Sequence, residues 1–152
     1  MKVYADNAAT TKISKKALES MMPCFEEIYG NPSSLHSVGQ DAFHVVRDAR
    51  NTIAECINAD PNDVYFSSGG SESDNWAIKG AAYLMAKKGK KHIISSKFEH
   101  HAVLHTLNAL EKEGFEITLL DVYENGIVKV EDVKNAIKDD TALVTIMYAN
   151  NE

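Results

Sequence analysis

The residues with the clearest chemical potential lie between positions 67 and 75. They read Ser-Ser-Gly-Gly-Ser-Glu-Ser-Asp-Asn directly after a short apolar stretch, a pattern typical of a strand, a glycine turn and the first turn of a helix. The backbone N–H groups and hydroxyl groups of such a turn point at one spot, where the positive end of a helix dipole favours an anion. The pattern therefore indicates a site for a phosphate or another anion.

Other interpretations of this turn match the residues less well or remain open beside the first. The lysine of a P-loop and the third glycine of a dinucleotide fingerprint are absent, and a nucleophile elbow needs glycine where Ser73 stands. Ser71 could instead cap the helix by accepting a hydrogen bond from the N–H of Asp74. Capping is compatible with anion binding, whereas Glu72 and Asp74 oppose an anion unless their side chains point away.

A second group of polar residues is the histidine cluster at 99–105. His101 and His105 are four residues apart and could share a helix face, as metal ligands do. The pattern is not H-E-x-x-H and no third ligand has a suitable spacing, so we predict no metal site; surface histidines at a helix start are the plain alternative. His100 is better placed to act on a ligand, because imidazole can stack on an aromatic ring and exchange a proton near pH 7.

Amide side chains form the third group, at Asn150 and Asn151. They follow an apolar segment that predicts a strand, and amides at the carboxyl end of a strand can hydrogen-bond a ligand. A loop or a frayed end explains them equally well. Residues 6–11 and 30–36 are polar and predict loops.

Apolar spacing predicts the elements that position these groups. Helices are expected at 14–29, with a kink at Pro23, at 37–57, with Ser37 and Gln40 as a capping box, and at 71–88, 101–113 and 131–137. Strands are expected at 64–66, 91–95, 115–120 and 142–147. Strands that alternate with helices predict an α/β fold with a mostly parallel sheet and helices on both faces. The three polar groups would then share the rim where the strands end.

Composition limits the function classes. A chain of 152 residues can form one domain with a real core. The net charge of −6 argues against a nucleic-acid partner, and no apolar run approaches the roughly 18 residues of a membrane span or forms a secretory signal. Cys24 and Cys56 make neither a disulfide framework nor a C-x-x-C pair. We therefore expect a cytoplasmic protein.

Five motifs occur in order along the chain. They are Tyr-Ala-Asp-Asn-Ala-Ala-Thr-Thr at 4–11, Gly-Asn-Pro-Ser-Ser at 30–34 with His36, Ser-Gly-Gly-Ser-Glu-Ser-Asp-Asn at 68–75, Glu99-His100 with Ala102-Val103, and Tyr-Ala-Asn-Asn-Glu at 148–152. Together they resemble NifS-like cysteine desulfurases, which belong to the class V aminotransferase-like, fold-type I group that uses pyridoxal 5′-phosphate (PLP). Related lyases and selenocysteine-directed enzymes share parts of the pattern.

The resemblance implies roles for matching residues. Gly70 and Ser71 would hold the PLP phosphate through backbone N–H groups and the Ser71 hydroxyl, although the family often has threonine where Ser71 stands. His100 would be catalytic, stacking on the pyridine ring and assisting proton transfer. Asn151 would hydrogen-bond the phenolic oxygen of the ring.

The resemblance also implies an activity and partners. Family members convert L-cysteine to L-alanine and pass the sulfur, held as an enzyme-bound persulfide, to acceptor proteins, as in iron–sulfur cluster assembly; a homodimer is expected. Residues 1–13 would be an N-terminal segment, a small-domain or interface arm. Residues 14–152 would be the N-terminal part of the PLP-binding large domain, in a truncated form.

Several family requirements have no counterpart in these 152 residues. The Schiff-base lysine, the acidic partner of the pyridine nitrogen and the sulfur-accepting cysteine lie further along the chain in the family, and Cys24 and Cys56 fall on expected helices. We therefore expect an N-terminal fragment that is inactive alone. The alternatives are a non-catalytic α/β module that binds a phosphate-bearing ligand, a related PLP or selenocysteine lyase, and a hydrolase with Ser71 as nucleophile.

Overall fold

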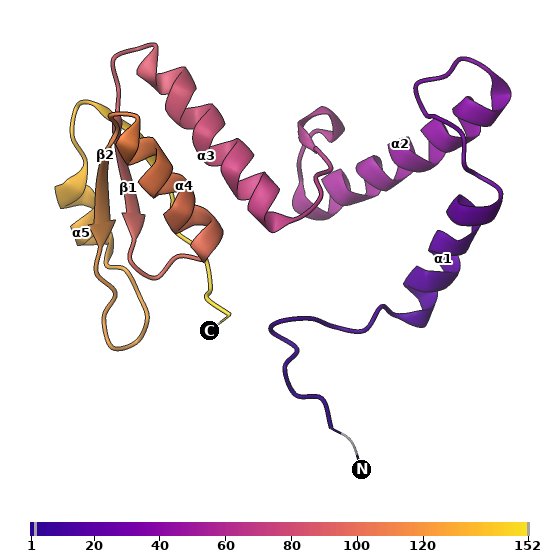
Figure 1. Cartoon of the computed structure of the whole chain (residues 1–152), viewed down its shortest axis with the longest axis horizontal. Helices are drawn as coiled ribbons and strands as arrows, with labels where there is room; N and C mark the ends of the chain where they lie inside the picture. The colour runs from indigo at the N-terminus through magenta and orange to yellow at the C-terminus, as the bar shows by residue number, and fades with distance from the viewer. Residues whose placement is uncertain (2, 152) are drawn as a thin grey trace. The chain divides into compact units, whose positions relative to one another are not determined.

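The computed structural model describes residues 1 and 3–151 and divides the chain into two compact units, Met1–Phe66 and Ser67–Glu152 (Figure 1). Each unit is described by itself. The first contains α1 (Lys15–Glu26), α2 (Ser37–Ile57) and the short 3-10 helix η1 (Pro61–Asp63). The second contains α3 (Gly70–Ala86), β1 (His92–Ser96), α4 (His101–Lys112), β2 (Glu116–Leu120), α5 (Val130–Ala136) and β3 (Thr141–Val144).

The two helices of the first unit begin at side-chain caps. Ser14 Oγ accepts a hydrogen bond from the N–H of Ala17 at 3.1 Å, which confirms the predicted start of α1. The predicted capping box at Ser37 is wrong, because His36 is the N-cap and its Nδ1 accepts from the N–H of Gly39 at 3.2 Å. The Gln40 side chain donates to the carbonyl oxygen of Ser34 instead.

The loop at 30–34 packs tightly against the start of α2. A Cβ atom at Gly39 would lie 2.7 Å from the carbonyl oxygens of both Asn31 and Ser34, closer than real side chains approach backbone. At Gly30 a Cβ atom would meet the backbone of Val38. Both glycines are therefore required by close approach of the backbone rather than by their torsion angles.

The second unit is a three-stranded parallel sheet with strand order β2-β1-β3. His92 pairs with Glu116 on one side and with Thr141 on the other, so β1 is the central strand, and all five of its residues are buried. α3 and α4 cover one face, where Ile93 packs in a core cluster with Ile78, Ala82, Val103, Leu107, Leu110 and Phe115. α5 lies on the other side of the sheet (Figure 1). The expected α/β architecture with helices on both faces is confirmed.

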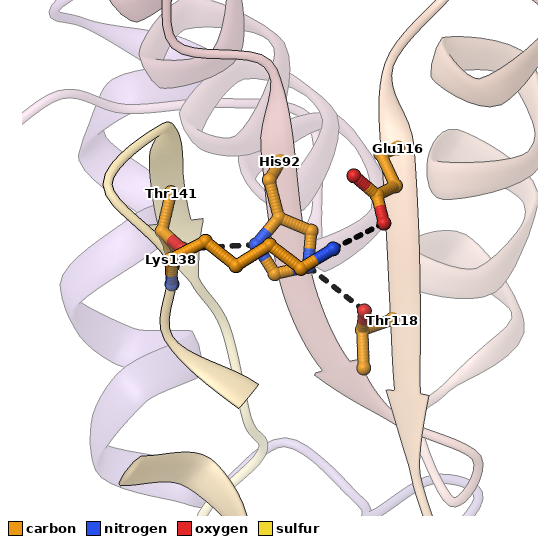
Figure 2. Close-up of polar contacts among 5 residues, drawn as sticks. All are labelled: His92, Glu116, Thr118, Lys138 and Thr141. Atoms are coloured by element: carbon orange, nitrogen blue, oxygen red, sulfur yellow. Dashed lines mark hydrogen bonds and ion pairs between the residues drawn. The ribbon is translucent and has the colours of Figure 1, made fainter. Parts of the chain in front are cut away.

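A polar group crosses the sheet on the α5 side (Figure 2). The buried ring of His92 lies between two threonine hydroxyls, with Nδ1 2.9 Å from Thr141 Oγ1 and Nε2 2.8 Å from Thr118 Oγ1. Lys138 forms an ion pair with Glu116 beside it. One side chain thus links all three strands.

The predicted strand at 64–66 is wrong. Residues 64–66 form no strand in the described chain; the carbonyl oxygen of Val64 accepts from Arg50 Nε at 3.1 Å, and the Arg50 guanidinium lies 5.1 Å from the centroid of the Phe66 ring. Residues 64–66 are thus held by the side chain of Arg50 on α2, and their backbone pairs with no strand of the described chain. The sheet therefore has three strands rather than four, and β3 ends at Val144, three residues before its expected end at 147.

Candidate functional site

A pocket of about 190 Å³ lies where the central strand and its neighbour β3 end. Two segments far apart in the sequence form it: the turn from β1 into α4, and the segment after β3. Parallel strands place their carboxyl ends at one edge of the sheet, and ligands of α/β proteins bind there. Its lining residues are Lys97, Phe98, Glu99, His100, His101, Leu104, Asn150 and Asn151.

His100 occupies the turn as the N-cap of α4, with φ −58° and ψ 147°. Its Nδ1 accepts a hydrogen bond from the N–H of Ala102 at 3.1 Å. An accepting Nδ1 carries no proton, so this bond assigns the proton of the neutral ring to Nε2. The cap therefore fixes both the position of the ring and the nitrogen that can donate.

The other two histidines of this cluster follow along α4. The ring of His101 lies 6.3 Å from that of His100 and 5.7 Å from that of His105, measured between centroids. Within residues 1 and 3–151, no group of three or more His, Cys, Asp or Glu side chains is arranged to hold a metal ion.

The segment after β3 reaches the pocket through two hydrogen bonds to the 96–99 turn. The N–H of Met147 donates to Glu99 Oε1 at 2.8 Å, and Asn150 Nδ2 donates to the carbonyl oxygen of Phe98 at 3.0 Å. Asn151 then lines the pocket together with His100. The structure thus brings these two predicted site residues together.

The predicted anion turn lies at the start of α3. Gly69 is the N-cap in an extended conformation, and no side chain of the described residues caps the helix. The predicted cap, Ser71 accepting from the N–H of Asp74, is therefore wrong. Gly70 has open space where a Cβ atom would stand, and Ser71 is exposed. The described pockets include neither residue, so the structure does not place them in the pocket of His100 and Asn151.

Glu72 points back across this turn. Its Oε2 accepts from both the N–H and the hydroxyl of Ser68, each at 2.6 Å. These bonds lower the pKa of the Glu72 carboxyl below its usual value. The neighbouring hydroxyls of Ser67 and Ser73 lie 2.6 Å apart. The first turn of α3 therefore uses one of its own carboxylates to order the loop. Glu72 does not point away from the turn, so its charge opposes an anion there, while the N–H groups of the first helical residues favour one.

The sequence interpretation missed the part played by Glu99. This side chain is only 7% exposed, and its Oε1 accepts from Ser96 Oγ at 3.0 Å as well as from Met147. An acidic residue directly before an N-cap is ordinary in a surface turn. The signal of its burial is a contact with a residue 48 positions away, which local spacing does not reveal.

Comparisons with known proteins extend over the whole chain. Residues 3–152 match the Aminotransferase class-V family. A cysteine desulfurase IscS of Clostridium botulinum (strain Hall) is 55% identical over 150 residues, covering 99% of this chain and 38% of that protein. The cysteine desulfurase IscS of Methanosarcina thermophila is 51% identical over 150 residues, covering 99% of this chain and 37% of that protein.

Solved structures agree with these relatives. A structure described as a NifS-like protein superposes with a TM-score of 0.96 at 39% identity, covering 100% of this chain and 42% of that one. The structure described as SspA in complex with cysteine gives a TM-score of 0.93 at 40% identity, covering 98% of this chain and 43% of that one. The chain spans 37–38% of the length of the two curated relatives named above.

Proposed function

The chain belongs to the aminotransferase class-V family, and on that premise we propose that it is the N-terminal part of a PLP-dependent cysteine desulfurase. One observation carries the proposal: His100 and Asn151, which the family motifs match to ring-binding positions, line one pocket at the carboxyl edge of a parallel sheet. Relatives named cysteine desulfurase at 55% identity over 99% of the chain support the same function.

The donor set fits PLP at both ends of that cofactor. α3 is 17 residues long and starts without a side-chain cap among the described residues, so its first N–H groups and the exposed Ser71 hydroxyl suit a phosphate. Gly70 leaves open space beside them. A flat imidazole and an amide, from His100 and Asn151, suit an aromatic ring with a phenolic oxygen. Bound PLP supplies an electron sink for chemistry at the amino acid's carbons.

His100 would carry the protein's proton chemistry. Its Nδ1 accepts from the N–H of Ala102, so Nε2 carries the proton of the neutral ring and is the nitrogen left to donate to a bound substrate. The same hydrogen bond holds the ring at the start of α4. Asn151 orients the cofactor ring from the opposite wall of the pocket, through an amide that can donate and accept.

The proposed substrate is L-cysteine, with alanine and a protein-bound persulfide as products and sulfur-acceptor proteins as partners. We place the protein in the cytoplasm as a homodimer, with iron–sulfur cluster assembly as the process. In the described part of the chain, no helix is both long and apolar enough to cross a membrane. Cys24 and Cys56 lie on α1 and α2 of the first unit and match no acceptor motif. We therefore propose that the 152 residues of this chain bind the cofactor, and that turnover needs the lysine and the cysteine of the family's later motifs.

A second candidate function is a non-catalytic module that binds a phosphate-bearing ligand. The observation that favours it is that Ser71 is not among the residues that line the described pocket of His100 and Asn151. In that case the start of α3 would bind a phosphate whatever group is attached to it.

Ligand titrations separate these functions. We expect PLP to raise the melting temperature more than pyridoxal or ADP does. Ser71→Ala should weaken binding of PLP but not of pyridoxal, which lacks the phosphate, whereas His100→Ala should weaken both. His105→Ala, on the next turn of α4, is the matched control. Equal stabilisation by ADP and PLP, unaffected by His100→Ala, would favour the non-catalytic module.

A further inference from the structure

Glu99 is the buried acidic side chain of the described residues. It stands directly before His100 and lines the same pocket, but its hydrogen bonds go to Ser96 and Met147 and to neither His100 nor Asn151. Its Oε1 accepts two hydrogen bonds, from Ser96 Oγ at the end of β1 and from the N–H of Met147 beyond β3. Burying a carboxyl group costs free energy unless hydrogen bonds replace its lost hydration, so the buried Glu99 side chain depends on its two donors.

The two donors lie on the two chain segments that lead into the walls of the pocket, Ser96 before the turn and Met147 before the Asn150–Asn151 segment. Ser96 Oγ also accepts from the N–H of Phe98 at 3.2 Å, so it shapes the turn that leads to His100. Ladder pairing of β3 ends with the N–H of Thr145 donating to the carbonyl oxygen of Ile94. Beyond that point the segment after β3 is joined to the turn by the bond from the N–H of Met147 to Glu99.

A second link lies three residues further along. Asn150 Nδ2 donates to the carbonyl oxygen of Phe98, and Asn151 follows at the pocket. The turn is tied to β2 as well, because the N–H of Lys97 donates to the carbonyl oxygen of Leu120 at 2.9 Å. The turn is thus fixed to β2 by backbone, whereas its connection to the Asn151 segment passes through side chains.

We infer that Glu99 is a positioning residue that sets the separation of His100 and Asn151 by joining the end of β1 to the segment after β3. The inference rests on the proposed function, in which His100 stacks on the face of the cofactor ring and Asn151 hydrogen-bonds its phenolic oxygen. Glu99 has no proposed bond to the cofactor itself. It acts by holding both walls through one oxygen atom.

The test compares Glu99→Ala with Glu99→Gln. The side-chain oxygen of glutamine can still accept from Ser96 and Met147, so Glu99→Gln should rescue the geometry. Glu111→Ala, an exposed site on α4, controls for loss of a glutamate. The first readout is NMR of the ligand-free chain, following cross-peaks between Phe98 and the Asn150 side-chain amide and the resonances of His100 and Asn151.

We expect Glu99→Ala to lose the Phe98–Asn150 cross-peaks and to shift the His100 and Asn151 resonances, while Glu99→Gln and Glu111→Ala keep them. Loss of protection at the Met147 N–H alone is not diagnostic, because removal of its acceptor produces it in any case. Unchanged Phe98–Asn150 cross-peaks and unchanged His100 and Asn151 resonances in a folded Glu99→Ala protein would overturn the inference.

The second readout is PLP affinity, measured by titration of the His100 and Asn151 resonances. Glu99→Ala should bind roughly tenfold more weakly than the parent chain, the scale of one lost hydrogen bond to a charged group, and Glu99→Gln should bind within about twofold. If the parent chain shows no PLP-dependent shift at these residues, the proposed function fails, and the ligand-free spectra still decide the role of Glu99.

Discussion

The ring of His92, on the central strand, is hydrogen-bonded to the hydroxyl of Thr141 on β3, 49 residues later in the sequence (Figure 2). Its other ring nitrogen, Nε2, is hydrogen-bonded to the hydroxyl of Thr118 on β2.

The first prediction follows from these two hydrogen bonds. His92→Leu leaves both threonine hydroxyls without the ring and should lower the free energy of unfolding by about 1–3 kcal/mol. Urea unfolding followed by circular dichroism measures it.

The exposed His105→Leu is the control for this change and should alter the free energy of unfolding by less than about 0.5 kcal/mol. A His92→Leu protein as stable as the parent chain would show that the two hydrogen bonds contribute nothing net.

The second prediction contrasts adjacent serines on β1. Ser95 Oγ is buried and has no hydrogen-bond partner among the described residues, whereas Ser96 Oγ donates to Glu99 and accepts from Phe98. Ser95→Ala should therefore leave stability unchanged or raise it by up to about 1 kcal/mol, and Ser96→Ala should lower it by about 1–3 kcal/mol. Thermal unfolding of both variants compares them, and equal losses would contradict the assignment of partners.

The third prediction contrasts two helical glycines. Gly39→Ala forces a Cβ atom to within 2.7 Å of two backbone carbonyl oxygens and should destabilise the first unit by about 1–3 kcal/mol. Gly80→Ala, on α3, meets no atom within 4 Å and should stabilise the second unit by about 0.5–1 kcal/mol. Urea unfolding of each variant measures the two effects, and the same sign for both would refute the close-packing argument.

The fourth prediction concerns acid stability. The two bonds from Ser68 lower the pKa of the Glu72 carboxyl below its usual value near 4.5, so the carboxylate stabilises the folded state above that pH, and the contribution is lost as the pH falls through the lowered pKa. Glu72→Gln should melt at a lower temperature than the parent chain at about pH 7, and the difference should shrink as the pH falls below about 4.5. Glu111→Gln is the charge control. A gap between Glu72→Gln and the parent chain that persists at low pH would contradict this origin.

The fifth prediction tests whether these residues hold PLP without a covalent bond. Lys97 lines the pocket, but its Nζ lies 2.6 Å from Asp121 Oδ1 in an ion pair. We expect borohydride reduction of the chain with PLP to label no lysine selectively, as read by peptide mass spectrometry. Selective labelling of Lys97, abolished in Lys97→Arg, would show that this chain supplies a Schiff-base lysine of its own.

Local patterns were sufficient wherever one element determines its own form. The spacing of Val103, Leu107 and Leu110 predicts α4 because those side chains cover one face of the sheet. Ligands bind at the carboxyl ends of parallel strands, and this rule predicts that His100 and Asn151 lie at the same edge of the sheet. The structure places both in one pocket.

Patterns failed wherever a distant or competing group decides the outcome. Val64 pairs with the Arg50 side chain instead of a strand. His36 takes the cap expected of Ser37 because its Nδ1 reaches the N–H of Gly39. Ser71 makes no cap because the N-cap position of α3 falls two residues earlier, at Gly69. Glu99 looks like a surface residue until its partner 48 positions away is known.

The strand order has a consequence for synthesis. β1 is the central strand, yet its neighbour β3 comes much later in the sequence: Thr141, which pairs with His92, lies 49 residues after it. At roughly 5–20 residues per second on the ribosome, β1 waits about 2–10 s for that partner. During this interval one edge of the most buried strand has no backbone partner, which is when a nascent chain is most open to pairing with a neighbour or to capture by a chaperone. Slower translation between β1 and β3 should therefore reduce the yield of folded protein more than slower translation before β1.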